Sequence, residues 1–157
     1  MRSRRGFSLS ELLVVLTILA LLVRFGFPRY NHLRKRAEAR SMLGDVQAVR
    51  VAAYNYTTEK GGWPADAPAG AVPPQLVTYL PGGFEFQRLN YTLDWEVWPT
   101  PNGVGGNAAT SVVIGLAVAT SDSALADAVR SAAKLGIPYL VSGTTTTFLL
   151  AGVGGNY

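Results

Sequence analysis

Glu11 is a charged side chain at the entrance to a strongly apolar stretch, the uninterrupted run from Leu12 to Val23. As a helix, residues 7–27 would rise about 31 Å, which matches the hydrocarbon core of a bilayer. A charged carboxylate deep in that core costs on the order of 2.5–3.5 kcal/mol. Because ionisable groups in a membrane span usually serve a function, Glu11 is the first candidate functional residue.

Cations flank the apolar stretch on both sides. Arg2, Arg4 and Arg5 precede it. Arg24 follows the stretch directly, and its long side chain can reach the headgroups from within the span. With the downstream cations it predicts a surface that contacts anionic membrane lipid. The predicted membrane-surface residues are Arg24, Arg29, Arg34, Lys35 and Arg36.

A basic start followed by an apolar run is also typical of a secretory signal peptide. Three features argue against an ordinary one. Glu11 is charged at the start of the run, no small-x-small cleavage site follows it, and the apolar pattern continues into a long helical pattern. A plain signal-anchored periplasmic protein remains an alternative.

The segment Gly6-Phe7-Ser8-Leu9-Ser10-Glu11-Leu12-Leu13-Val14-Val15-Leu16 resembles the N-terminus of type IV pilins and type II secretion pseudopilins. That family has a short basic leader ending in glycine, an aromatic first mature residue and glutamate as the fifth mature residue. Phe27-Pro28-Arg29-Tyr30 is similar to the family's helix-kinking proline with its following tyrosine, and Arg36 falls where the family often has arginine. The resemblance covers roughly the first 35 residues.

The resemblance implies a role for each of these positions. A prepilin peptidase would cut between Gly6 and Phe7, and the new Phe7 amine would be N-methylated. Glu11 of one subunit would neutralise the Phe7 ammonium of a neighbour and thereby set the register of assembly. Gly26 and Pro28 would kink the helix. The implied partners are prepilin peptidase, other pilin or pseudopilin subunits and an inner-membrane assembly platform.

Composition divides the chain into five expected segments. They are a cleaved basic leader (1–6), a transmembrane and assembly half of a long helix (7–27), an amphipathic half (28–62), a connecting loop (63–83) and a β-rich head (84–157). The formal charge of the whole chain is +4, and removal of the three leader arginines leaves +1. From residue 41 onward, five basic residues face eight acidic ones. Such a mildly acidic head does not favour nucleic acid as a partner.

The amphipathic half is predicted from an apolar stripe with helical spacing. We expect this stripe to pack on the head, and the run Gly61-Gly62-Trp63-Pro64 to end the helix. The stripe consists of Leu33, Ala37, Leu43, Val46, Val49, Ala53 and Tyr56.

The head is predicted to contain four strands and one helix. Leu89, Tyr91, Leu93, Trp95 and Val97 alternate with polar residues, which is typical of a half-buried strand. Further strands are expected at 111–119, 139–142 and 145–151, with a tight turn at Gly143. A helix over 122–134, capped by Ser121, lies between them. The predicted fold class is α+β and pilin-like, a long N-terminal helix packed on a small, mainly antiparallel four-stranded sheet with an inserted helix.

Residues for catalysis or metal binding are scarce. The only histidine, His32, lies in the basic segment, so no Ser-His-Asp site is expected in the head. The chain has no cysteine, and after Pro99 its only acids are Asp122 and Asp127. We therefore expect no enzyme activity, no cofactor and no metal site.

These observations predict a structural subunit of a type IV pilus-like filament or a type II secretion pseudopilus. The precursor would lie in a bacterial inner membrane with its head in the periplasm, and the assembled form would be a periplasmic pseudopilus or an extracellular filament. A minor pilin that binds DNA for uptake is a further alternative, against which the acidic head argues.

Overall fold

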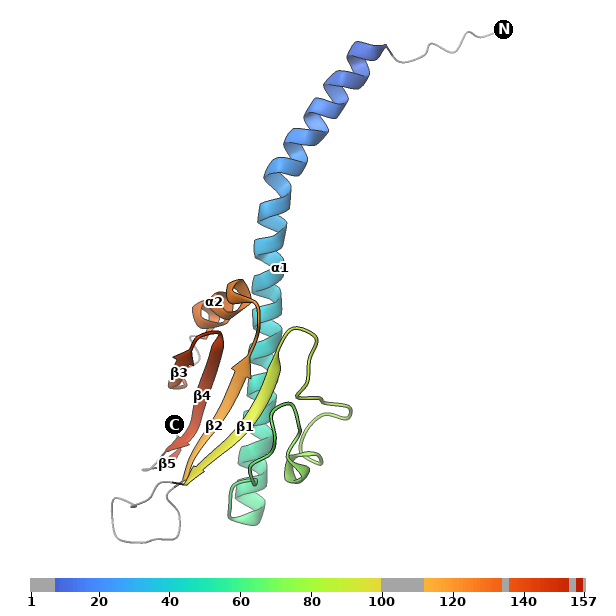
Figure 1. Ribbon diagram of the computed structural model, residues 1–157. Helices are drawn as coiled ribbons and strands as arrows, with labels where there is room; N and C mark the ends of the chain where they lie inside the picture. Colours follow the sequence, from blue (N-terminus) through green and yellow to red (C-terminus); the bar gives the residue numbers. More distant parts are fainter. Residues whose placement is uncertain (1–7, 100–111, 134–135, 153–154, 157) are drawn as a thin grey trace. The chain divides into compact units, whose positions relative to one another are not determined.

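The computed structural model describes residues 8–99, 112–133, 136–152 and 155–156. The chain forms two compact units, Met1–Lys35 and Arg36–Tyr157. Helix α1, Leu9–Lys60, contributes to both, because the boundary between the units falls within it (Figure 1).

The C-terminal end of α1 is set by a glycine. Gly61 has a φ of +74°, a left-handed conformation that L side chains rarely adopt. Its backbone N–H donates to the Thr57 carbonyl over 2.8 Å and so satisfies one of the last orphan acceptors of the helix. The prediction that the run Gly61-Gly62-Trp63-Pro64 ends the helix is confirmed.

The second unit contains one antiparallel sheet, beside which the second half of α1 runs (Figure 1). Its order is β1-β2-β4-β3, and β5 also pairs with β4. This arrangement confirms the predicted α+β class with four antiparallel strands, and adds a short fifth strand that was not predicted. The strands are β1 Thr92–Pro99, β2 Val112–Ala119, β3 Tyr139–Ser142, β4 Thr145–Gly152 and β5 Gly155–Asn156.

Helix α2, Ser123–Ala132, connects β2 to β3 as predicted. Its N-cap is Asp122, whose carboxylate accepts a hydrogen bond from the Leu125 N–H over 3.1 Å. The prediction of Ser121 as the cap is wrong by one residue. Both side chains are good caps, and the choice depends on where the chain leaves β2, because Thr120 Oγ1 holds the Asp122 N–H at 3.2 Å.

The core lies between the second half of α1 and the inner face of the sheet. From the strands come Leu93, Trp95, Ile114, Leu116, Phe148 and Leu150, all with no exposed surface. From α1 come Ala39, Met42, Leu43, Val46, Val49, Ala52 and Ala53. The predicted stripe is therefore right from residue 43 onward and wrong before it, since Leu33 and Ala37 are exposed. More than one face of this helix has apolar residues at helical spacing, and packing against the sheet determines which face is buried.

The segment between α1 and β1 completes one edge of the core. It contains a single 3₁₀ turn, η1 Pro74–Leu76, and buries Leu76, Leu80 and Phe86. Trp63 packs edge-on against Tyr54 of α1, with ring centroids 5.5 Å apart, and lies 6.5 Å from Trp95. These contacts tie the end of α1 to β1.

Candidate functional site

Within the described part of the first unit, the first half of α1 has no packing partner. All of its described side chains from Ser8 to Arg34 are exposed. An 18-residue window has a mean hydropathy of 2.1 with none of it buried, so by length and composition the helix can cross a membrane. An exposed apolar surface of this extent indicates contact with lipid or with other protein. In this half of α1 the aliphatic and phenylalanine side chains with the highest exposed fractions are Leu9, Leu13, Leu22, Val23, Phe25 and Phe27.

A capping box begins this helix. The Ser8 N–H donates to Glu11 Oε2 over 2.9 Å, and the Glu11 N–H donates to Ser8 Oγ over 3.2 Å. Two N–H groups at the helix start are thereby satisfied, and the carboxylate lies at the positive end of the helix dipole. The Ser-x-x-Glu spacing is visible in the sequence, whereas the predicted partner of Glu11 was only intermolecular. Ser8, the other member of this capping box, was not among the predicted site residues.

The other predicted assembly positions are only partly described. Gly6 and Phe7, the predicted cleavage and methylation site, lie outside the described residues. Gly26 and Pro28 lie within the helical assignment of α1, which continues through both. The kink at these two residues stays a prediction.

The predicted membrane-surface cations lie on consecutive turns of α1. Arg24, Arg29, Arg34 and Arg36 are exposed, and Lys35 is half-buried. Exposed guanidinium groups are available to anionic headgroups, although their contact with lipid stays a prediction.

A second surface feature lies in the head, where the chain turns into β1. Arg88, Leu89, Asn90 and Tyr91 form a turn closed by a 3.0 Å bond from the Arg88 N–H to the Tyr91 carbonyl. Leu89 at its tip is 98% exposed, so its predicted place on the buried side of a strand is wrong. The alternation holds only from Tyr91, because a turn breaks the period of two.

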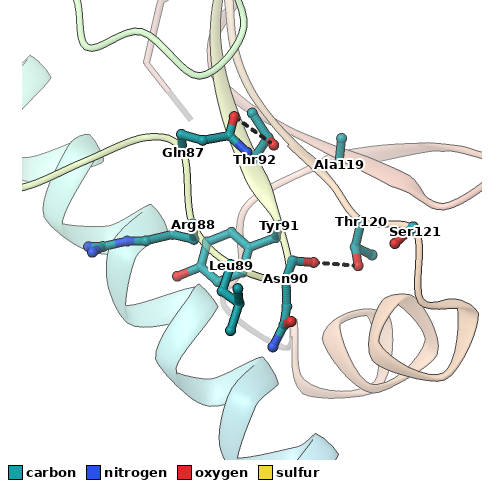
Figure 2. Close-up of a pocket in the computed structure, with 9 residues that line it drawn as sticks. All are labelled: Gln87, Arg88, Leu89, Asn90, Tyr91, Thr92, Ala119, Thr120 and Ser121. Carbon is teal, nitrogen blue, oxygen red and sulfur yellow. Dashed lines mark hydrogen bonds between the residues drawn. The ribbon is translucent and has the colours of Figure 1, made fainter.

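This turn and the end of β2 line an open hollow of about 400 Å³, shown in Figure 2. Gln87 pairs with Thr92 on one side, and the Asn90 carbonyl accepts from Thr120 Oγ1 over 2.8 Å on the other. The lining side chains are neutral except Arg88. They include no acid, base or nucleophile pair of the kind that general acid–base catalysis requires.

Arg88 is occupied by a contact with α1. Its Nε donates to Asp45 Oδ2 over 3.2 Å, and the Tyr91 hydroxyl donates to the same oxygen over 2.6 Å. Burial, reinforced by this hydrogen bond to Asp45, raises the pKa of Tyr91 well above its ordinary value. The network fastens the turn to the helix and is structural in character.

Two carboxylates on the outer face of β1 have raised pKa values. Burial is the main cause for both Asp94 and Glu96, and the negative charge of Asp66 adds to it. Among the described residues, no group of three or more His, Cys, Asp or Glu side chains is arranged to hold a metal ion. This cluster is therefore a source of repulsion within the head.

Comparison with known proteins identifies the N-terminal segment. Residues 1–23 match the family model of the prokaryotic N-terminal methylation motif. The type IV major pilin protein PilE1 of Neisseria gonorrhoeae is 30% identical over 71 residues, which cover 45% of this chain and 33% of that protein. The fimbrial protein EcpC of Eikenella corrodens is 29% identical over 69 residues, which cover 44% of this chain and 45% of that protein.

These matches span less than half the length of either relative, and no solved structure matches the chain. The matched motif coincides with the capping box and the exposed apolar half of α1. The methylation motif and the two relatives therefore show that the N-terminal part of the chain is similar to that of type IV pilins.

Proposed function

We propose that the protein is a structural subunit of a type IV pilus-like filament, inserted as a membrane-anchored precursor and assembled through the first half of α1. The observation that supports this most directly is the coincidence of the methylation motif with an apolar helix half whose described side chains are all exposed. The relatives named as a pilin and a fimbrial protein favour a pilus over a type II secretion pseudopilus. The role is structural rather than enzymatic.

Processing precedes assembly in this proposal. Prepilin peptidase removes residues 1–6 at the inner membrane, and the Phe7 amine is then methylated. Residues 7–27 hold the precursor in the bilayer, with Arg24, Arg29, Arg34, Lys35 and Arg36 near anionic headgroups and the head in the periplasm. The inner-membrane assembly platform then transfers subunits from this pool into the filament, where the kink at Gly26 and Pro28 adapts the helix to its new neighbours.

Glu11 has two successive partners in this scheme. In the single chain it accepts from the Ser8 N–H, and in the filament it also neutralises the Phe7 ammonium of a neighbouring subunit. In the filament core a Glu11 carboxylate without a cationic partner is costly. Only a subunit in the correct axial position brings its Glu11 to the Phe7 ammonium of a neighbour, so this contact favours the correct register.

Mass spectrometry of the N-terminus tests the processing step. Co-expression with a prepilin peptidase is expected to yield a chain that starts at methylated Phe7, whereas a Gly6→Leu variant keeps its leader. Recovery of the uncut chain, under conditions in which the same peptidase cuts another prepilin, would contradict the proposal.

Sheared filaments test the role of Glu11. Glu11→Gln keeps the capping box, because a glutamine side chain can accept the same bond, but it removes the charge. We expect this variant to insert and to be cut, yet to be depleted at least about tenfold from filaments, as for loss of one partner of a buried ion pair. Incorporation at the wild-type level would show that the charge has no such role.

A further inference from the structure

Arg24 is a cation in an otherwise apolar part of α1. Val23 and Phe25 on either side of it are 64% and 72% exposed, and Arg24 itself is exposed. Within the described part of the chain, no carboxylate lies within ion-pair distance of its guanidinium. In the membrane this side chain can reach headgroups, but a filament provides no such counter-charge.

The only acid in the same helix half is Glu11, thirteen residues earlier. Along a helix this separation is about 20 Å, and the two side chains point about 140° apart around the axis. They cannot meet within one chain. Glu11 still has acceptor capacity, because its contact with the described residues uses only Oε2, which accepts from the Ser8 N–H, and a carboxylate can accept several hydrogen bonds.

We propose that Arg24 of one subunit pairs with Glu11 of a second copy, displaced by about 20 Å along the shared axis toward the C-terminal end of the first helix. The inference rests on the proposed assembly through this helix half. All copies are inserted by the same leader and run parallel, so the displacement has one direction.

Charge complementarity favours a second copy over any other occupant. Each chain brings Glu11 and Arg24 into the apolar segment at a constant offset, so every added subunit offers an anion to the Arg24 of its neighbour. The Glu11 carboxylate has two oxygens and can accept from both this guanidinium and the Phe7 ammonium. A contact that joins two different sites on identical chains is heterologous, and such contacts continue into helical filaments unless they close into a ring. An arginine removed from water also forms two parallel hydrogen bonds to a carboxylate, and this strict geometry stabilises only one relative position of the two helices.

The absence of cysteine from the sequence allows this offset to be measured directly by disulfide trapping. Val14 and Phe27 each lie three residues after the charged residue, so the proposed displacement brings Val14 of one copy level with Phe27 of the next. Both are exposed and part of no core, so cysteine at these positions leaves the head intact. The full-length Val14→Cys/Phe27→Cys variant is oxidised in assembled filaments.

We expect a ladder of covalent oligomers from this variant. The matched control Val14→Cys/Leu33→Cys moves the second cysteine by about 9 Å along the axis, to another exposed position. It should give no ladder, because neither the proposed displacement nor the contact between Glu11 and Phe7 brings these two positions level. Equal ladders from both variants, or none from the first in filaments that do form, would overturn the proposal. Because the filaments themselves are observed, this failure is distinct from failure to assemble.

Charge variants give a second readout. Arg24→Glu places two carboxylates together and should lower filament yield at least about tenfold, whereas Arg24→Lys should retain most of it. Processing at Gly6–Phe7 should be unchanged in both variants, which separates this effect from the processing step. If Arg24→Leu and Arg24→Glu both assemble like wild type, the partner of Arg24 is a lipid headgroup and the proposal is wrong.

Discussion

The two halves of α1 share one secondary structure but differ in what surrounds them. Up to Arg34 its described side chains are all exposed, although most are apolar. From Ala39 to Ala53 one face is buried under the sheet and the other remains exposed. The first half is predominantly apolar around its whole circumference, which fits surroundings supplied from outside the chain, whereas the second half is amphipathic and packs on the core of the same chain. Substitutions in the two halves should therefore affect different measurements.

The largest difference in unfolding free energy is expected between alanine substitutions at Trp95 in the head and at Leu16 in the first half of α1. Trp95 has no exposed surface and its Nε1 donates to the Pro64 carbonyl over 3.3 Å, so Trp95→Ala should destabilise the head by about 3–5 kcal/mol. Leu16 is 58% exposed, and Leu16→Ala should change that stability by less than about 0.5 kcal/mol. Denaturant unfolding of the full chain in detergent, followed by fluorescence of Trp63 and Trp98, measures both. Similar losses in the two variants would refute the contrast.

The polar contact between the head and α1 should be the next largest. Tyr91→Phe removes the bond to Asp45 Oδ2 and should cost about 1.5–3 kcal/mol, the range for hydrogen bonds to charged groups. Because the folded-state pKa of Tyr91 is raised, its stabilisation is complete below the unfolded value near 10 and is lost as pH rises above it.

Unfolding titrations between pH 8 and about pH 11 test this sign. The wild-type chain should lose stability more steeply than Tyr91→Phe above pH 10. Tyr79→Phe is the comparison variant, because the pKa of Tyr79 is also raised, by a hydrogen bond to Glu59. That contact lies at the exposed surface, where solvent screens it, so Tyr79→Phe should change the slope less than Tyr91→Phe. Identical slopes for wild type and Tyr91→Phe would contradict the assignment.

Alanine substitutions at two glycines, one on the sheet and one on the exposed face of α1, should change the stability of the head in opposite directions. A Cβ at Gly115 on β2 would come within 2.5 Å of the Trp98 ring, so Gly115→Ala should destabilise the head by about 1–3 kcal/mol. Gly44 on the exposed face of α1 has nothing within 4 Å, and Gly44→Ala should stabilise by about 0.5–1 kcal/mol. A Trp98→Ala background should relieve most of the Gly115 penalty, and persistence of the full penalty would locate the clash elsewhere.

The smallest expected effect is local to the first half. Ser8→Ala removes one acceptor of the capping box and should weaken the start of α1 by about 1 kcal/mol. Amide hydrogen exchange at Leu9–Glu11 should accelerate, while exchange in the sheet stays constant. A change in sheet protection would mean that the two halves are coupled more strongly than their separate surroundings indicate.

Prediction from sequence succeeded where a local rule decides the outcome. The stop at Gly61, the β3–β4 turn at Gly143 (φ +59°) and the alternation from Tyr91 to Val97 depend on one residue type or a short period. It failed where a choice between equivalent positions depends on distant residues. Ser121 and Asp122 are both good caps, and Leu89 is part of an alternating pattern until the Arg88–Tyr91 turn interrupts it.

The sequence by itself determined the apolar helix, its charges at Glu11 and Arg24, the methylation motif and the α+β class, because each follows from local composition and spacing. Only the tertiary structure decided which face of α1 is buried, that Tyr91 and Arg88 share Asp45, and that β4 lies between β2 and β3. The physical reason is that burial and partner choice depend on residues far apart in the chain, whose proximity no local pattern records.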